Sequence, residues 1–443
     1  MLKNLHEKPD KEGVEIKVSE AGFPAIFPSG LEYSSPARGH WNIVNTGLLV
    51  PETHLIYICA ASCLRGVVLT AAEQGLQDRF STIAIRENNV LSGDNEEMIV
   101  EGVGDVISRL PYKPKAFMVY TSCVQTFIGC DLQHTFKTLR ETYPDFHFID
   151  GYMYPIMRKT SMPPIPQTRI TMYSLIDERE KNSRRINLIG NNLKTDRTGR
   201  FWDILEANGY ELKEIQDCEN WEDFQEMGSA VLNLVFNPTA VPAAKVLKKK
   251  HGQDYIYIPF SHDSEEIAES LNKVLDKLGI AREEWTEEKT MASKALQDAK
   301  ALIGDTPVVI DYTAVTRPLG LAKVLLNAGF NVKKVYMDTI TADEKADFEY
   351  LQKNYPDLLL NGTVNPKMRF LHHEKADEKW LAIGQQASYF IGSNNYVDTI
   401  ENGGMYGYEG VVAMAEWMKD AFTTEKDAKS LIQIKGWGCG SCI

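Results

Sequence analysis

The sequence predicts an α/β protein built from three Rossmann-like domains, each with a parallel sheet covered by helices on both faces. Short apolar runs alternate with longer helical stretches along most of the chain, as in the run 54–59 and the helical stretch 64–75 that follows it. Such an alternation is typical of βαβ units, in which consecutive strands are parallel. With 443 residues, the chain is also too long for a single typical core. We therefore expect several sheets that repeat one plan.

The same alternation divides the chain into segments. Residues 1–40 are rich in Pro, Gly and charge and are expected to form an arm, and domains follow at 41–180, 181–290 and 291–443. The predicted strands cover 54–59, 80–85, 115–123, 146–150, 185–190, 231–236, 255–260, 307–312 and 332–338. The predicted helices cover 64–75, 96–110, 131–143, 200–209, 241–252, 265–279, 283–304, 319–330, 346–355 and 408–422. Four prolines in 153–168 favour a connector there.

Composition excludes several classes of protein. The chain is 43% apolar and 25% charged, as in an ordinary globular protein. A formal charge of −13 without a compensating basic block argues against nucleic acid as the main partner. The apolar runs are too short to span a membrane, and the polar N-terminus lacks the apolar core of a signal peptide. Seven cysteines then suit a reducing cytoplasm and metal or redox chemistry.

Two cysteines stand at the carboxyl ends of predicted strands. Cys63 and Cys123 each follow an apolar run and precede a helical stretch. Ligands of open parallel sheets bind beyond these strand ends, so the two thiols are expected to face one object together. Cys59 and Cys130 lie close by in sequence and bring the number of candidate thiolates to four. Thiolates gathered in this way are the usual ligands of iron–sulfur clusters.

Four segments together resemble component 1 of nitrogenase and its relatives, which include the light-independent protochlorophyllide and chlorophyllide reductases and the methylthio-alkane reductases. The resemblance extends from about Arg38 to about Lys419. The segments are, in order, RGHWNIVNTGLLVPETHLIYICAASCLRG, TSCVQTFIGCDLQ, RRINLIGNN and MYGYEGVVAMAEWM. The resemblance implies the three-domain fold of nitrogenase component 1 subunits.

The resemblance also implies a ligand set. Cys63 and Cys123 match two cluster-ligating cysteines of the family, but the third cysteine, expected about twenty-five residues before Cys63, is missing. His40, a main-chain group or Cys59 is a candidate substitute. Cys130 occupies a position where many relatives carry an acidic or other polar residue. A four-iron cluster shared with a partner subunit and an eight-iron cluster of the P type both fit this set.

The ligands of the nitrogenase active-site cofactor are absent by the same comparison. Tyr406 stands at the position of the family's histidine, and Phe236 and Asn237 stand where its cysteine follows a strand. Three possibilities remain open. The cavity where the domains meet could hold an organic substrate, it could hold a second metal cofactor in another way, or the chain could be a β-type subunit. Tyr406 is expected to line this cavity.

Two other groups of candidate ligands lie near the C-terminus. Cys439 and Cys442 form a C-x-x-C pair flanked by glycines, and we expect this tail to fold back towards the metal centre or the cavity. A flexible end with incidental cysteines is the alternative. His372 and His373 could bind a metal, but an exposed pair in a loop is the favoured interpretation.

The resemblance implies a subunit of the catalytic component of an ATP-dependent, nitrogenase-like reductase. Such a subunit pairs with a homologous component 1 subunit in an α2β2 assembly. It receives electrons from a separate ATP-hydrolysing iron–sulfur protein, and its relay cluster passes them to the substrate or cofactor cavity. One alternative is a non-catalytic scaffold for assembly of a metal cofactor. Another is a metal-free protein of the same fold that binds a small molecule.

Overall fold

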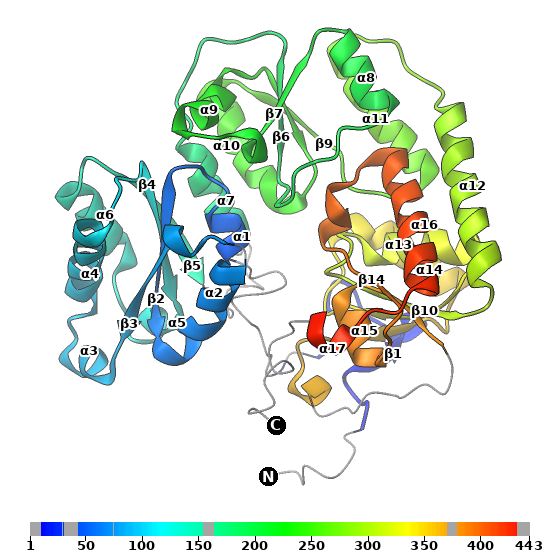
Figure 1. Ribbon diagram of the computed structural model, residues 1–443, viewed down its shortest axis with the longest axis horizontal. Coiled ribbons are helices and arrows are strands. Elements are labelled where there is room, and N and C mark those ends of the chain that lie inside the picture. The colour runs from blue at the N-terminus through cyan, green and yellow to red at the C-terminus, as the bar shows by residue number, and fades with distance from the viewer. Residues whose placement is uncertain are drawn as a thin grey trace. The chain divides into compact units, whose positions relative to one another are not determined.

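Three sheets form the framework of the protein in a computed structural model (Figure 1). The structure describes residues 10–28, 30, 43–73, 75–153, 164–369 and 379–431. The sheets have six, four and four strands, and every pairing but the one that involves β1 (Glu15–Lys17) is parallel among the named strands of the described residues. The predicted α/β class with three Rossmann-like sheets is therefore confirmed.

The first sheet has the strand order β3-β2-β4-β5. Its strands are β2 (Thr53–Ala60), β3 (Phe80–Ile85), β4 (Ala116–Ser122) and β5 (His147–Met153). The two central strands are buried at every position except Ala60, because helices cover both faces of the sheet. The helices of this region are α1 (Ile43–Gly47), α2 (Ala61–Glu73), α3 (Glu87–Ser92), α4 (Asn95–Arg109), α5 (Cys123–Phe127) and α6 (Leu132–Thr142).

The two faces of the first sheet have different cores. Alternate residues of β2 point to opposite faces, so Tyr57 and Cys59 share one face and Ile56 and Ile58 share the other. The Tyr57 face packs against α1, α2 and α7 (Pro164–Ser174), and the Ile56 face packs against α4 and α6 (Figure 1). Cys59 thus lies on the face that α2 covers.

The second sheet has the order β7-β6-β8-β9. Its strands are β6 (Arg185–Ile189), β7 (Glu211–Glu214), β8 (Leu232–Val235) and β9 (Asp254–Tyr257). The helices α8 (Arg200–Ala207), α9 (Trp221–Glu226) and α10 (Val241–His251) follow β6, β7 and β8. Apolar residues of β6, β8, α7 and α10 join the core formed by the α2 face of the first sheet, so these two sheets share one hydrophobic cluster.

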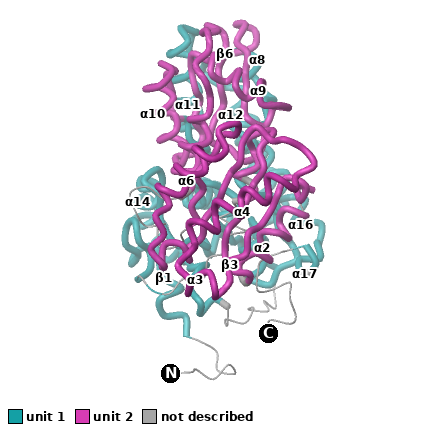
Figure 2. The backbone as a smooth tube through the Cα atoms, turned by 90° about the vertical axis from the view of Figure 1, so that its left-hand side faces the viewer, with its two compact units in different colours: residues 1–33, 195–204, 258–443 teal, residues 34–194, 205–257 magenta. Residues whose placement is uncertain are grey.

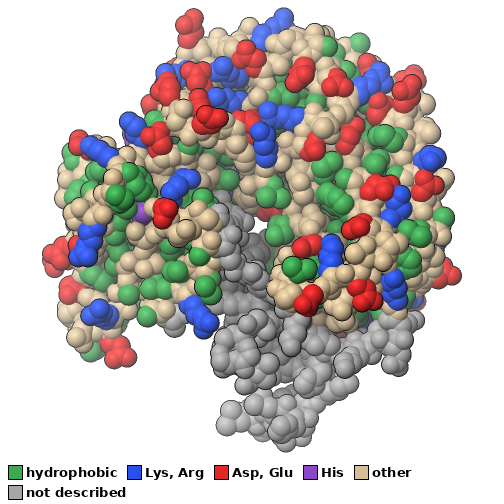
Figure 3. Space-filling model, viewed as in Figure 1, with side chains coloured by type: hydrophobic (Ala, Val, Ile, Leu, Met, Phe, Trp, Pro, Cys, Tyr) green, Lys and Arg blue, Asp and Glu red, His purple; other side chains and the backbone are tan. Residues whose placement is uncertain are grey.

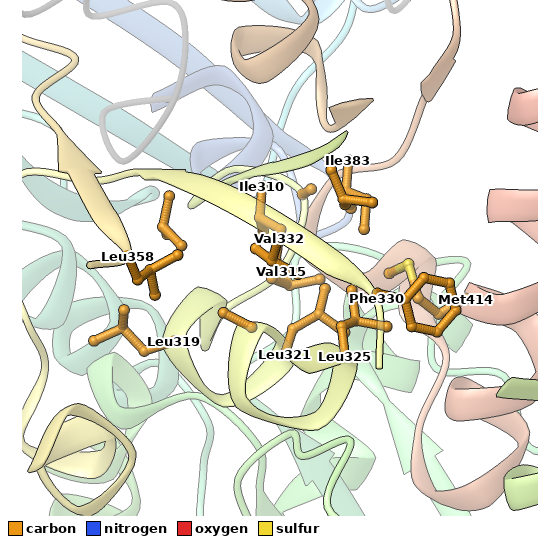
Figure 4. Packing of buried hydrophobic residues seen from close by; sticks show 14 of the residues in the cluster. Ile310, Val315, Leu319, Leu321, Leu325, Phe330, Val332, Leu358, Ile383 and Met414 are labelled. Carbon is orange, nitrogen blue, oxygen red and sulfur yellow. The ribbon is translucent and has the colours of Figure 1, made fainter. Parts of the chain in front are cut away.

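The third sheet has the order β1-β12-β11-β10-β13-β14. Its later strands are β10 (Pro307–Asp311), β11 (Asn331–Tyr336), β12 (Leu359–Asn361), β13 (Leu381–Ile383) and β14 (Tyr396–Val397). Its helices are α11 (Ser264–Leu278), α12 (Thr286–Ile303), α13 (Pro318–Asn327), α14 (Lys345–Asn354), α15 (Gln385–Ile391), α16 (Gly407–Thr423) and α17 (Ala428–Leu431). Leu321 and Leu325 of α13 pack beneath Ile310 and Val332 in the core of this sheet (Figure 4).

Contacts within the chain define two compact units (Figure 2). One unit contains the first two sheets and comprises residues 34–194 and 205–257. The other contains the third sheet and comprises residues 1–33, 195–204 and 258–443. On the face shown in Figure 3, acidic and basic side chains are interspersed over the described surface. None of the helices in the described ranges has the length and apolarity to cross a bilayer.

Two segments contain elements that the sequence did not predict. The region predicted as a connector contains α7, which begins at Pro164, because proline is compatible with the first turn of a helix even though it breaks the interior. The segment expected to be an arm contains β1, which pairs antiparallel with β12, Ile16 lying opposite Leu360. A strand of three residues is too short to give a periodic pattern, so the sequence did not predict it.

Candidate metal centre

Three cysteines lie at the carboxyl edge of the first sheet. Cys59 is the penultimate residue of β2, Cys63 lies in the first turn of α2, and Cys123 is the first residue of α5, directly after β4. Strands β2 and β4 are parallel neighbours, with Ile58 opposite Thr121, so their carboxyl ends meet. The register of these two strands therefore brings the two cysteine-bearing loops together, as the sequence predicted.

The three thiols interact with one another. Cys59 is fully buried, and its thiol donates a hydrogen bond to the carbonyl oxygen of Ala60 at 3.3 Å and is in contact with the thiol of Cys63. This contact and burial raise the pKa of Cys59 far above its ordinary value. Burial, and then the neighbouring Cys63, raise the pKa of Cys123 as well. Thiols in such a group keep their protons unless a cation is present, and metal binding removes these protons.

A buried tyrosine lies beneath the group. Tyr57 is 2% exposed and shares a face of β2 with Cys59. Burial, followed by the nearby Cys59, raises the pKa of Tyr57, and Cys63 and Cys123 contribute in the same direction. The phenol therefore stays protonated and can donate its O–H towards sulfur.

The described thiols are the kind of ligand that an iron–sulfur cluster takes, but they are too few to complete its ligand set. Within the described ranges, no group of three or more Cys, His, Asp or Glu side chains is arranged to hold a metal ion. The ligands of a cluster bind different iron atoms, so they need not converge on one point. An all-sulfur donor set suits such a cluster, and these three thiols leave at least one ligand of a four-cysteine site to come from elsewhere.

Cys130 and Cys218 lie apart from this group. Burial, followed by the nearby Glu96 of α4, raises the pKa of Cys130 to about 11. Burial raises the pKa of Cys218 to about 12, and the charges near Cys218 belong to residues of its own region, among them Lys213 and Asp223. Both are free thiols without a described interaction with Cys59, Cys63 or Cys123.

The remaining candidate ligands lie outside the residues that the structure describes. These are His40, His372, His373, Cys439 and Cys442.

The comparison with known families decides the identity of the fold. The sequence profile described as Nitrogenase component 1 type Oxidoreductase matches residues 53–423, which is most of the chain. The chain belongs to this family. A comparison with curated protein sequences gives no match.

Solved structures agree with the family. A nitrogenase Cp1 chain at pH 6.5 is similar with a TM-score of 0.63 and 14% sequence identity, over 91% of this chain and 94% of that chain. A nitrogenase Cp1 chain at pH 5 is similar with a TM-score of 0.58 and 14% identity, over 93% of this chain and 94% of that chain. At this identity the similarity supports the component 1 fold and no finer assignment.

Tyr406, which the sequence comparison predicts to stand at the position of the family's histidine, is buried in the unit that contains the third sheet. It is 5% exposed and packs against Trp202 and Phe260, with ring centroids 6.2 and 5.6 Å away. Burial raises the pKa of Tyr406 far above its usual range, so its hydroxyl is neutral. The residue therefore forms part of an aromatic cluster at the start of α16.

The segment after β8 carries no thiol. Phe236 is buried, and the Asn237 side chain accepts hydrogen bonds from the N–H and hydroxyl of Thr239, at 3.0 and 2.7 Å. Asn237 thus caps the short helical turn Pro238–Ala240. Gly190, with a φ of +107°, lies so close that an added Cβ would be 2.9 Å from the Cβ of Ala240. The local packing here depends on these small and capping residues.

Sequence reasoning missed one residue at the thiol group, Gln125. Its side chain is fully buried between the ends of β2 and β4. A signal was present, because Ser122 and Gln125 have the spacing of a capping box at the start of a helix. The contact between Gln125 and β2 could not be predicted, since it depends on the register of the two strands.

Proposed function

We propose that the chain is a subunit of the catalytic component of a nitrogenase-like, ATP-dependent reductase and holds an iron–sulfur relay cluster through Cys63 and Cys123. The observation that carries this proposal is the grouping of Cys59, Cys63 and Cys123 at two adjacent strand ends in a chain of the component 1 family. Cys59 is the candidate for a third ligand. A bound cluster would supply one-electron transfer.

The chain's own residues favour such a site in three ways. The partly buried Cys63 and Cys123 can reach a group outside the sheet, whereas the buried Cys59 forms the floor beneath them. Tyr57 offers a neutral O–H donor on the same face, and hydrogen bonds to sulfur are one means by which a protein adjusts cluster potential. The first turns of α2 and α5 hold the two outer thiols on regular backbone.

The incomplete ligand set supports a shared site. The described residues offer three grouped sulfurs, so a further ligand has to come from another part of the chain or from a second subunit. We propose that a homologous component 1 subunit provides it in an α2β2 assembly. The electron donor is then a separate ATP-hydrolysing iron–sulfur protein, and the complex works in the cytoplasm.

The second part of the proposal concerns the substrate or cofactor that the chain binds. With Phe236 or Asn237 at the cysteine position and Tyr406 at the histidine position, the chain lacks the Cys/His pair that would anchor a nitrogenase-type metal cofactor. We propose that the chain binds an organic substrate or a differently held cofactor, or that its partner subunit carries the active site. Detection of a cofactor metal bonded to Tyr406 or a neighbouring side chain would contradict this part.

The test is metal analysis followed by turnover. Anaerobically purified protein in complex with its homologous partner subunit should contain iron and acid-labile sulfide in similar molar amounts, and the isolated chain is analysed beside it. The complex should then oxidise the reduced ATP-dependent iron–sulfur protein. Protein without iron or sulfide in both preparations would instead support a metal-free protein that binds a small molecule.

A cofactor-assembly scaffold is the second candidate. The observation that favours it is the same loss of the Cys/His pair, because a scaffold need not hold a finished cofactor tightly. A scaffold should bind the cluster, transfer a metal precursor to an acceptor protein, and show no turnover with the reductase. Reductase-dependent turnover would exclude a purely non-catalytic scaffold.

A further inference from the structure

Gln125 lies between the two strand ends that carry the thiol group. It is fully buried, and its Oε1 accepts hydrogen bonds from the backbone N–H and the hydroxyl of Ser122, both at 2.8 Å. Its Nε2 points to the carbonyl oxygen of Ile58 in β2, at 3.4 Å. One amide group therefore contacts the end of β4 and the end of β2 at the same time.

The contacted residues are the direct neighbours of two of the thiols. Ser122 precedes Cys123, and Ile58 precedes Cys59, with Cys63 one helical turn beyond. A buried amide is costly to leave without partners, so its position is defined by the groups that satisfy it. A shift of the first turn of α5 relative to β2 would break the contact between Gln125 and the carbonyl oxygen of Ile58.

We infer that Gln125 is a positioning residue that fixes the spacing between the Cys63 and Cys123 thiols before any metal binds. The inference deepens the proposed function and rests on it, since the thiol pair matters only if both cysteines are ligands. Gln125 itself touches no reacting group. It acts through the two loops that it joins.

The experiment compares Gln125→Met with Gln253→Met. Methionine keeps the length of the side chain and removes both hydrogen-bonding groups. Gln253 is a matched control, because it is also fully buried in the same unit and donates to backbone carbonyls, those of Met227 and Gly228 at 2.8 and 3.0 Å. Its contacts lie at the second sheet, away from the thiols.

The first readout is the spacing of the thiols in the reduced, metal-free full chain. A short bifunctional thiol reagent is added to each variant in a Cys59→Ala background, and the Cys63–Cys123 cross-link is followed by mass spectrometry. We expect Gln125→Met to cross-link about tenfold more slowly than the parent, because reactions within a molecule depend on held geometry. Gln253→Met should react at the parent rate. Equal rates for Gln125→Met and the parent would overturn the inference.

A second variant covers the case in which Gln125→Met fails to fold. Gln125→Glu keeps an acceptor for Ser122 but has no donor for Ile58, and it should also cross-link slowly. A folded Gln125→Glu that reacts at the parent rate would overturn the role of the contact between the loops.

A second readout separates this inference from the proposed function. Each variant with native Cys59 is reconstituted with ferrous iron and sulfide, and bound iron and the cluster reduction potential are measured. Gln125→Met should bind less iron or show a shifted potential, with Gln253→Met unchanged. A parent protein that binds no cluster even with its homologous partner subunit present would refute the proposed function, whereas the cross-linking result would still decide the role of Gln125.

Discussion

The thiol of the fully buried Cys59 neighbours the thiol of Cys63, across the junction between β2 and α2. Cys123 comes to the same place from the neighbouring strand. The sheet therefore groups three sulfurs from two loops without any disulfide among the described cysteines.

Replacing Cys130 with Ala should leave the iron content unchanged. Its thiol lies beside Glu96 and has no described interaction with the other three cysteines. Replacing Cys59 with Ala should lower the iron content, because that thiol is in direct contact with Cys63. Iron and sulfide analysis of the two variants after identical reconstitution checks both expectations. A loss of iron in Cys130→Ala would place this residue in the ligand set.

Glu344 should make the stability of the protein depend on pH. Its carboxyl is 1% exposed and accepts a hydrogen bond from the N–H of Leu319 at 2.8 Å. Burial raises its pKa from 4.5 to about 7. Because the pKa of Glu344 is higher in the folded than in the unfolded protein, the protonated carboxyl stabilises the folded state. This stabilisation is complete below about pH 4.5 and is lost as the pH rises to about 7.

The variant Glu344→Gln cannot ionise and keeps an acceptor for Leu319. Relative to this variant, the wild type should lose about 3 kcal/mol of unfolding free energy between pH 4.5 and pH 8. Urea unfolding of both proteins at several pH values measures the difference. Parallel stability curves over this range would contradict the assignment.

Asp347 should be important for the stability of the unit that contains the third sheet. Its carboxylate is 1% exposed and accepts hydrogen bonds from Arg317 Nη2 at 2.6 Å and from Lys323 Nζ at 2.9 Å. Replacing it with Ala leaves two largely buried cations short of a partner, which costs about 3–5 kcal/mol. Thermal unfolding should show a clear loss for Asp347→Ala. Asp357→Ala, which removes an exposed ion pair with Lys17, is the control and should change little.

The C-terminal pair Cys439 and Cys442 lies outside the described residues, and its role remains a prediction. If the tail is a ligand arm, deletion of residues 438–443 should lower the iron content or the turnover. A control variant with both cysteines replaced by serine keeps the length of the tail and should show the same loss. Full metal loading and turnover in the deletion variant would leave the tail without a metal-binding role.

The sequence predicted the parts of the fold that local patterns determine. The apolar run before Cys63 and the run before Cys123 are buried on both faces of the sheet, so each is a short continuous apolar run, and its alternation with helical stretches identified β2 and β4 and placed both thiols at strand ends. The sequence could not predict which thiols meet, because the grouping of Cys59 with Cys63 and the separate position of Cys130 depend on tertiary packing. The bridge made by Gln125 depends on strand register in the same way.

The most direct test of the central claim is the iron and sulfide content of Cys63→Ala and Cys123→Ala, with Cys218→Ala as the matched control. Cys218 is also a partly buried free thiol of the same unit, but it lies apart from the group. The proposal predicts that each of the first two variants loses most of its cluster iron and no longer accepts electrons, while Cys218→Ala equals the wild type. Wild-type iron content and cluster spectra in both Cys63→Ala and Cys123→Ala would contradict it.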